Sequence, residues 1–125
     1  KKRMRIRMML AGVAAAGLMA FPAMAQDGEY GDPLREMLTE AAAGTCSEAW
    51  MAPSLLSACN GQIAGMSQGL QALGAIESMT FVSARDTPEG RVETWNVAYA
   101  SGQTLNWVIG HRQPDGKFVV AGTGG

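Results

Sequence analysis

The only histidine in the sequence, His111, is the side chain best suited to chemistry near neutral pH. An imidazole titrates in the physiological range and can both accept and donate a proton. Proton-transfer catalysis also needs a second group, commonly a carboxylate, close to the substrate. Two carboxylates, Glu77 and Glu93, fall in strand-like segments, and only Glu93 shares a face with Trp95. Because neither is well placed to serve His111, an enzyme that uses this histidine is kept only as an alternative.

The other residue types form no familiar catalytic or cofactor-binding pattern. No serine has an adjacent base, no glycine-rich loop suits a phosphate, and the histidine and cysteines lack the spacing of metal ligands. The sequence therefore predicts no catalytic residue, no metal site and no cofactor.

Three aromatic residues, Trp95, Tyr99 and Trp107, offer a different kind of site. They occupy alternating positions in two strand-like segments. Aromatic side chains gathered on one face can line a pocket for an apolar ligand. Packing in the only core of a small domain is the competing interpretation. We take these three residues together with His111 as the candidate ligand-binding set.

The first 25 residues have the pattern of a secretory signal peptide. The basic cluster KKRMRIR precedes an apolar segment from Met8 to Phe21, and Ala23 and Ala25 form a cleavage motif before Gln26. The apolar segment is shorter than the about 20 residues that a membrane-spanning helix needs. We therefore expect a periplasmic or secreted protein with no membrane attachment after cleavage.

The part of the chain expected to remain after cleavage is acidic. Five of the ten basic residues precede Gln26, whereas all eleven acidic residues follow it, so the net charge becomes −6. The remaining basic residues are scattered, and a negatively charged protein repels a phosphate backbone, which disfavours binding of nucleic acid. A chain of about 100 residues suffices for one domain with a modest core.

Cys46 and Cys59 are the only cysteines, and both belong to the part expected to be exported. An even number of cysteines in an oxidising compartment argues for a disulfide. Two buried free thiols are the alternative. The spacing is not the C-x-x-C of a redox-active pair, so the sequence predicts a structural disulfide.

Two helices should begin the domain, which we place at residues 32–125 after a polar, flexible tail at residues 26–31. The first helix has Asp32 as its N-cap, Pro33 at its first position and an apolar stripe that ends at Gly44. The second begins at Pro53, and its apolar face comprises Leu56, Cys59, Ile63, Met66, Leu70 and Leu73.

The second helix also carries three glycines at four-residue spacing, Gly61, Gly65 and Gly69. Glycine in a helix interior costs about 0.8 to 1 kcal/mol relative to alanine, so some contact should offset the cost. We expect close packing against residues 41–43 at the end of the first helix. A seam for the close approach of a partner is the alternative.

From Ile76 the apolar period changes from 3.6 to 2, which is typical of strands. Strands are expected at residues 76–84, 91–100, 104–111 and 117–122, and their short connections require an antiparallel meander. A three-residue loop from Ser101 to Gln103 would place Tyr99 opposite Leu105 and unite both apolar sets on one face, with His111 on that face at the strand's far end. A two-residue loop would separate the two sets.

This order of elements resembles the small α+β domain of nuclear-transport-factor-like fold that accompanies many beta-lactamase-family serine hydrolases. The positions that match are Gly74, Met79, Phe81, Trp107, Asp115 and Gly116. The resemblance implies two N-terminal helices packed on a four-stranded sheet that curves into a cone-like half barrel. It carries over no catalytic residue, because the S-x-x-K motif of the hydrolases is absent from the sequence.

We therefore expect a non-catalytic exported module. Its predicted partner is a small apolar ligand or another protein, such as a serine hydrolase. A homodimer formed through the sheet is a further option, and a small isomerase or hydrolase that uses His111 is the alternative function.

Overall fold

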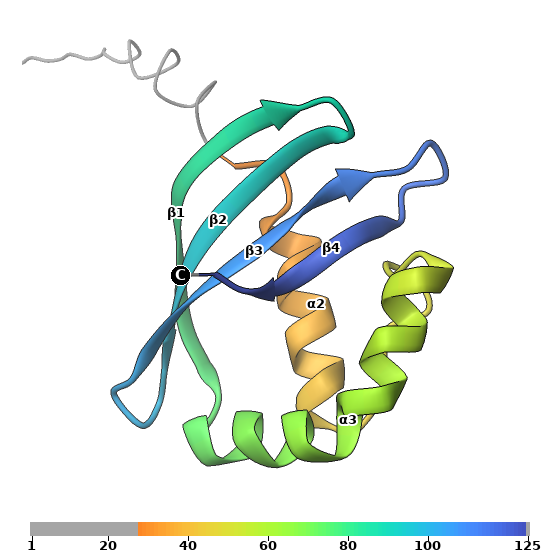
Figure 1. The fold of residues 1–125 in the computed structure, drawn as a ribbon. Coiled ribbons are helices and arrows are strands. Elements are labelled where there is room, and N and C mark those ends of the chain that lie inside the picture. Colours follow the sequence, from red (N-terminus) through yellow and green to blue (C-terminus); the bar gives the residue numbers. More distant parts are fainter. Residues whose placement is uncertain (1–27, 125) are drawn as a thin grey trace, which may run out of the picture.

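Two helices precede a four-stranded antiparallel sheet in the computed structural model, which describes residues 28–124 (Figure 1). The elements are α2 (Gly31–Ala42), α3 (Pro53–Leu73), β1 (Ile76–Thr87), β2 (Gly90–Tyr99), β3 (Thr104–Arg112) and β4 (Phe118–Thr123). The strands lie side by side in chain order, and the sheet does not close on itself. The predicted α+β class and meander are confirmed. The predicted signal peptide lies outside the described residues.

The buried face of α2 consists of the apolar stripe expected from the sequence together with Pro33: Pro33, Leu34, Met37, Leu38 and Ala41. The helix ends just before Gly44, which adopts a left-handed φ of 93° that suits glycine. The predicted N-cap is wrong. The helix begins one residue before Asp32, and Tyr30 holds the N-cap position without a side-chain hydrogen bond.

Tyr30 also shows that part of the segment expected to be flexible is held in place. Its side chain is 6% exposed, and its ring packs edge-on against Phe118 with the centroids 4.8 Å apart. Residues 26 and 27 lie outside the described residues. At Glu29 and Tyr30 the backbone is tied to the sheet by Glu93, whose contacts are given below.

The three glycines of α3 do not pack as expected. A side chain added at Gly61, Gly65 or Gly69 would meet no described atom within 4 Å apart from the helix's own backbone, so none of them contacts residues 41–43. At the end of α2 the two helices are joined by polar groups, because Ser67 and Gln71 both donate hydrogen bonds to the carbonyl oxygen of Ala42. Figure 1 shows that α3 bends along its length, and glycine within a helix is a recognised cause of bending.

The disulfide between Cys46 and Cys59 is present, as predicted, and its Cα atoms lie 6.0 Å apart. Both residues are buried, and the bond ties the connection between the two helices to the buried face of α3. Within residues 28–124, no helix combines the length and apolarity needed to cross a membrane.

Replacing both Cys46 and Cys59 with serine should lower the free energy of unfolding by about 2 to 4 kcal/mol, because the bond restricts the unfolded chain. Urea unfolding of the oxidised protein and the variant gives the difference. Two titratable thiols in the non-reduced protein would show that the bond does not form.

All three hairpins differ in detail from the expectation, and the connection between β3 and β4 is residues 113–117 rather than 112–116. Thr87 pairs with Gly90, so β1 and β2 are joined by two residues rather than the six expected. In the next hairpin the three-residue length is correct, but the loop is Ala100 to Gly102, since the Tyr99 N–H donates to the carbonyl of Gln103. The reason is Gly102, whose φ of 93° fits the last position of such a loop.

The shift of this loop changes the register by two residues and leaves the faces unchanged. Trp95 lies opposite Trp107, and Val97 lies opposite Leu105. Because the side-chain period of a strand is two, the apolar sets still share one face. Val97, Tyr99, Trp107 and Ile109 are all at most 7% exposed and form the sheet's contribution to the core.

Candidate functional site

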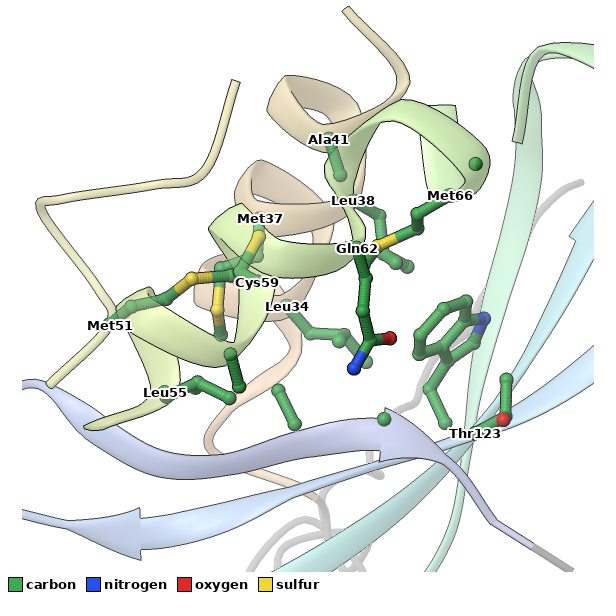
Figure 2. Close-up of a pocket in the computed structure, with 15 residues that line it drawn as sticks. Leu34, Met37, Leu38, Ala41, Met51, Leu55, Cys59, Gln62, Met66 and Thr123 are labelled. Atoms are coloured by element: carbon green, nitrogen blue, oxygen red, sulfur yellow. The ribbon is translucent and has the colours of Figure 1, made fainter. Parts of the chain in front are cut away.

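A groove with a volume of about 520 Å³ lies between α3 and the edge of the sheet formed by β4 (Figure 2). Its floor is the buried face of α2, through Leu34, Met37, Leu38 and Ala41. One wall is α3, through Leu55, Ala58, Cys59, Gln62, Gly65 and Met66. The other is the sheet, through Trp107, Ala121, Gly122 and Thr123, and Met51 completes the lining.

No ionisable side chain lines this groove. Gln62 and Thr123 supply its only polar side chains, and the rest of the lining is apolar or glycine, apart from the disulfide sulfur of Cys59. Residues 49–76, between Glu48 and Glu77, include no acidic or basic residue, so the wall formed by α3 is neutral on every face. A charged ligand that entered this groove would lose its hydration and find no partner for its charge, which costs free energy.

Space remains in the groove because small residues stand where larger side chains would fill it. Gly65 and Gly122 both line it, and neither has a neighbouring atom within 4 Å of an added Cβ, the local backbone aside. Methionines also line it, at Met37, Met51 and Met66, and their unbranched side chains adapt to ligands of varied shape. The arrangement suits a molecule held by shape and apolar contact.

Gln62 is the polar group best placed to orient such a molecule. Its side chain points from α3 into the groove, toward β4 (Figure 2). It makes no hydrogen bond with another residue in the described range, and its amide offers both a donor and an acceptor. The sequence analysis did not select Gln62, because a glutamine on an exposed helical position gives no signal of its own.

The four residues predicted to bind a ligand are not brought together. Trp107 lines the groove, whereas Trp95, Tyr99 and His111 do not. Tyr99 lines a separate, smaller pocket of about 270 Å³ next to α2. Trp95 of β2 packs against Phe81 of β1, with the ring centroids 5.6 Å apart. Neither strand is next to β4 in the sheet.

Trp107 and Tyr99 are nonetheless linked beneath the groove. The indole Nε1–H of Trp107 donates a buried hydrogen bond of 2.9 Å to the hydroxyl of Tyr99. Burial raises the pKa of Tyr99, so this hydroxyl stays neutral. The bond fixes the tilt of the indole, and one side of the indole forms part of the groove wall.

His111 lies outside the groove, at the end of β3. Its φ of 56° departs from strand geometry, so the alternation used to predict its direction does not apply there. Its Nε2 lies 3.2 Å from the hydroxyl of Thr87, the last residue of β1. No hydrogen bond or ion pair joins a carboxylate to His111 within the described part of the chain, and Glu93 is bonded to other groups.

Glu93 is the buried carboxylate that the sequence analysis did not recognise. Its side chain is fully buried on the core face of β2. Oε1 accepts hydrogen bonds from the Tyr30 N–H at 3.0 Å and the Trp95 indole at 2.8 Å. Oε2 accepts from the Glu29 N–H at 2.7 Å and from the Arg91 guanidinium at 2.7 Å.

These four donors decide what Glu93 can do chemically. Burial alone would raise its pKa, but the hydrogen bonds from Glu29, Arg91, Trp95 and Tyr30 outweigh burial and lower the pKa below its ordinary value. A carboxylate that is ionised and fully occupied by donors is a poor proton acceptor. Glu93 therefore anchors the segment before α2 rather than acting as a base.

In the described range, no cluster of three or more histidine, cysteine, aspartate or glutamate side chains is arranged to hold a metal ion. Comparison with known proteins gives no further guide, because no protein-family model, curated protein or solved structure matches this chain.

Proposed function

We propose that this protein is a non-catalytic binding module that holds an uncharged, mainly apolar ligand in the groove between α3 and β4. The observation that carries the proposal is the neutral groove of about 520 Å³. Its volume falls within the range of about 300 to 1,000 Å³ typical of ligand pockets, and its few polar groups suit orientation rather than charge recognition.

The proposal includes export from the cytoplasm. The Cys46–Cys59 disulfide fits an oxidising compartment, where such bonds form and persist. The signal-peptide pattern of residues 1–25 supports the same location. In that setting the module would meet its ligand in the periplasm or outside the cell.

A fluorescent displacement assay tests the function. The uncharged probe N-phenyl-1-naphthylamine should bind with increased emission, and 1-decanol should displace it. Decanoate at pH 8 has the same chain length but carries a charge, so it should displace the probe only at concentrations at least tenfold higher. Equal displacement by both competitors would argue against an uncharged ligand, and failure of the probe and of 1-decanol to bind would remove the proposal.

A pair of glycine variants tests the location of binding. Gly65→Leu should weaken probe binding at least tenfold, because the new side chain enters the groove. Gly69→Leu lies one turn further along the same helix and outside the groove, so it should bind as the unmodified protein does. Both substitutions should favour the helix by a similar amount, about 0.8 to 1 kcal/mol, so a difference in binding does not come from stability.

His111→Ala serves as a second control outside the groove. It should leave probe binding unchanged, because His111 does not line the groove. Loss of binding in Gly69→Leu or His111→Ala, with binding retained in Gly65→Leu, would place the ligand elsewhere.

A further inference from the structure

We propose that the natural occupant of the groove is an extended polypeptide segment, uncharged over the residues that enter, which adds to the sheet along the outer edge of β4. This inference rests on the proposed function, because it names the chemical class of molecule that the same groove takes. Strand addition to an exposed sheet edge is a general mode of peptide recognition, with affinity from main-chain hydrogen bonds and specificity from alternate side chains.

At the first residue of β4, the outer edge of this strand already pairs with an extended segment of the same chain. The Phe118 N–H donates to the carbonyl of Trp50 at 2.8 Å, and the Ala52 N–H donates to the carbonyl of Phe118 at 2.9 Å. Met51 and Phe118 thereby form a parallel bridge. At Pro53 the segment turns away into α3, and beyond this point no other strand of the described chain pairs with that edge.

The hydrogen-bond alternation shows which groups of β3 face β4. The Tyr99 N–H donates to the Gln103 carbonyl, which makes this the first hydrogen-bonded pair of the β2–β3 ladder. Hydrogen-bonded pairs recur at every second position of an antiparallel ladder. The backbone groups of Trp107 and Ile109 therefore point toward β2 and not toward β4.

The partners of those two residues on β4 consequently present their own backbone groups outward. Thr123 pairs with Trp107, and Ala121 pairs with Ile109. The neighbouring Asn106 carbonyl accepts the Gly124 N–H, which agrees with this alternation. The alternation is interrupted at His111, whose φ is 56° and which is left out of the pairing with β4, so Phe118 also faces the outer edge. The N–H and C=O groups of Ala121 and Thr123 thus point away from β3, along the open edge, and both residues line the groove.

The opposite wall leaves room for an added strand and offers it a further contact. Gly65 has no side chain to obstruct the space, and the Gln62 amide points into it from α3. A side-chain amide matches a peptide group, since each carries one acceptor and at least one donor. Neutral walls exclude charged side chains, whereas the apolar floor of α2 would receive every second side chain of the segment.

Blocked pentapeptides test this inference in the displacement assay. The peptide acetyl-Ser-Leu-Ser-Leu-Ser-amide alternates apolar and polar side chains and carries no charge. It should displace N-phenyl-1-naphthylamine at concentrations at least tenfold lower than acetyl-Leu-Leu-Ser-Ser-Ser-amide, whose composition is identical but whose apolar residues do not alternate. Equal displacement by the two peptides would overturn the inference.

Methylation of the peptide nitrogens then separates strand addition from apolar capture. Methyl groups at every second nitrogen should weaken displacement at least tenfold, and those at the intervening nitrogens should change it less than twofold. On the protein, Ala121→Pro removes only an outward N–H, a position where an edge strand tolerates proline. It should weaken displacement by acetyl-Ser-Leu-Ser-Leu-Ser-amide at least tenfold more than it weakens displacement by 1-decanol.

The outcomes distinguish this inference from the function on which it rests. If 1-decanol displaces the probe but no peptide does, or if all methylated nitrogens have equal effect, strand addition is wrong and the apolar-ligand function stands. If neither 1-decanol nor peptide displaces the probe, the function itself fails. Should Ala121→Pro not fold, the methylated peptides still decide.

Discussion

Replacing Glu93 with alanine should lower the free energy of unfolding by about 3 to 5 kcal/mol, because a buried donor left without its acceptor costs about 1 to 3 kcal/mol and several donors lose Glu93 together. The substitution leaves the Arg91 guanidinium, the Trp95 indole and the Glu29 and Tyr30 N–H groups without their acceptor. It also releases the segment that begins α2. Urea unfolding at pH 7, followed by tryptophan fluorescence, measures the loss.

Two further variants make the result specific. Glu77→Ala removes an exposed carboxylate from β1 and should change stability by no more than about 0.5 kcal/mol. Glu93→Gln keeps one carbonyl acceptor but places an NH₂ group against donors. Its loss of unfolding free energy should therefore fall between those of Glu77→Ala and Glu93→Ala. A Glu93→Ala variant as stable as Glu77→Ala would contradict the anchoring role.

The anchoring role of Glu93 should also make the stability of the protein depend on pH. Because the pKa of Glu93 is lowered in the folded protein, its contribution is fully present above the unfolded pKa of about 4.5 and is lost as the pH falls through the lower folded pKa. The unfolding free energy should therefore drop in acid below about pH 4.5. The drop should be smaller in Glu93→Gln, which has no carboxylate to protonate.

Replacing Trp107 with alanine should lower the free energy of unfolding by about 3 to 5 kcal/mol, as expected for emptying a large buried position. Trp107 is 7% exposed and lies opposite Trp95 near the centre of the sheet. The variant also leaves the buried hydroxyl of Tyr99 without its donor. Thermal and urea unfolding of the variant and the unmodified protein give the difference.

Trp107→Phe divides this loss between packing and hydrogen bonding. It retains most of the apolar body but removes the indole N–H, so the cost should approach the about 1 to 3 kcal/mol of an unsatisfied buried group. If Trp107→Ala proves as mild as a surface substitution, then Trp107 does not belong to the core face, and the register between β2 and β3 is wrong.

Periodicity predicted the elements and their buried faces because it reports directly on which side of a helix or strand is apolar. The stripe of α2, the change of period at Ile76 and the shared face of Trp95 and Trp107 all follow from it. The exact loop was missed, although Gly102 carries the signal. A left-handed residue ends such a loop, and glycine adopts that conformation most easily.

The groove was beyond prediction because periodicity shows where apolar faces lie and not whether the space between them is filled. The glycines of α3 suggested packing against α2, yet Gly65 leaves open space on the side of β4. The aromatic residues were selected by type, and only Trp107 borders that space. Gln62 was missed because its importance comes from its position opposite β4.

The role of Glu93 was equally hidden, since its backbone donors at Glu29 and Tyr30 are more than sixty positions away in sequence. No local pattern links those residues. His111 was misplaced for a different reason. Its direction was inferred from strand alternation, which a residue with a φ of 56° does not follow.

The central claim, that a neutral apolar molecule binds between α3 and β4, is tested most directly by the indole N–H signals in a ¹H–¹⁵N correlation spectrum during titration with 1-decanol. The protein has three tryptophans, Trp50, Trp95 and Trp107, and only Trp107 lines the groove. Its indole signal should shift progressively and saturate, while those of Trp50 and Trp95 stay in place. A titration that moves the Trp95 or Trp50 signal and leaves the Trp107 signal unchanged would contradict the account.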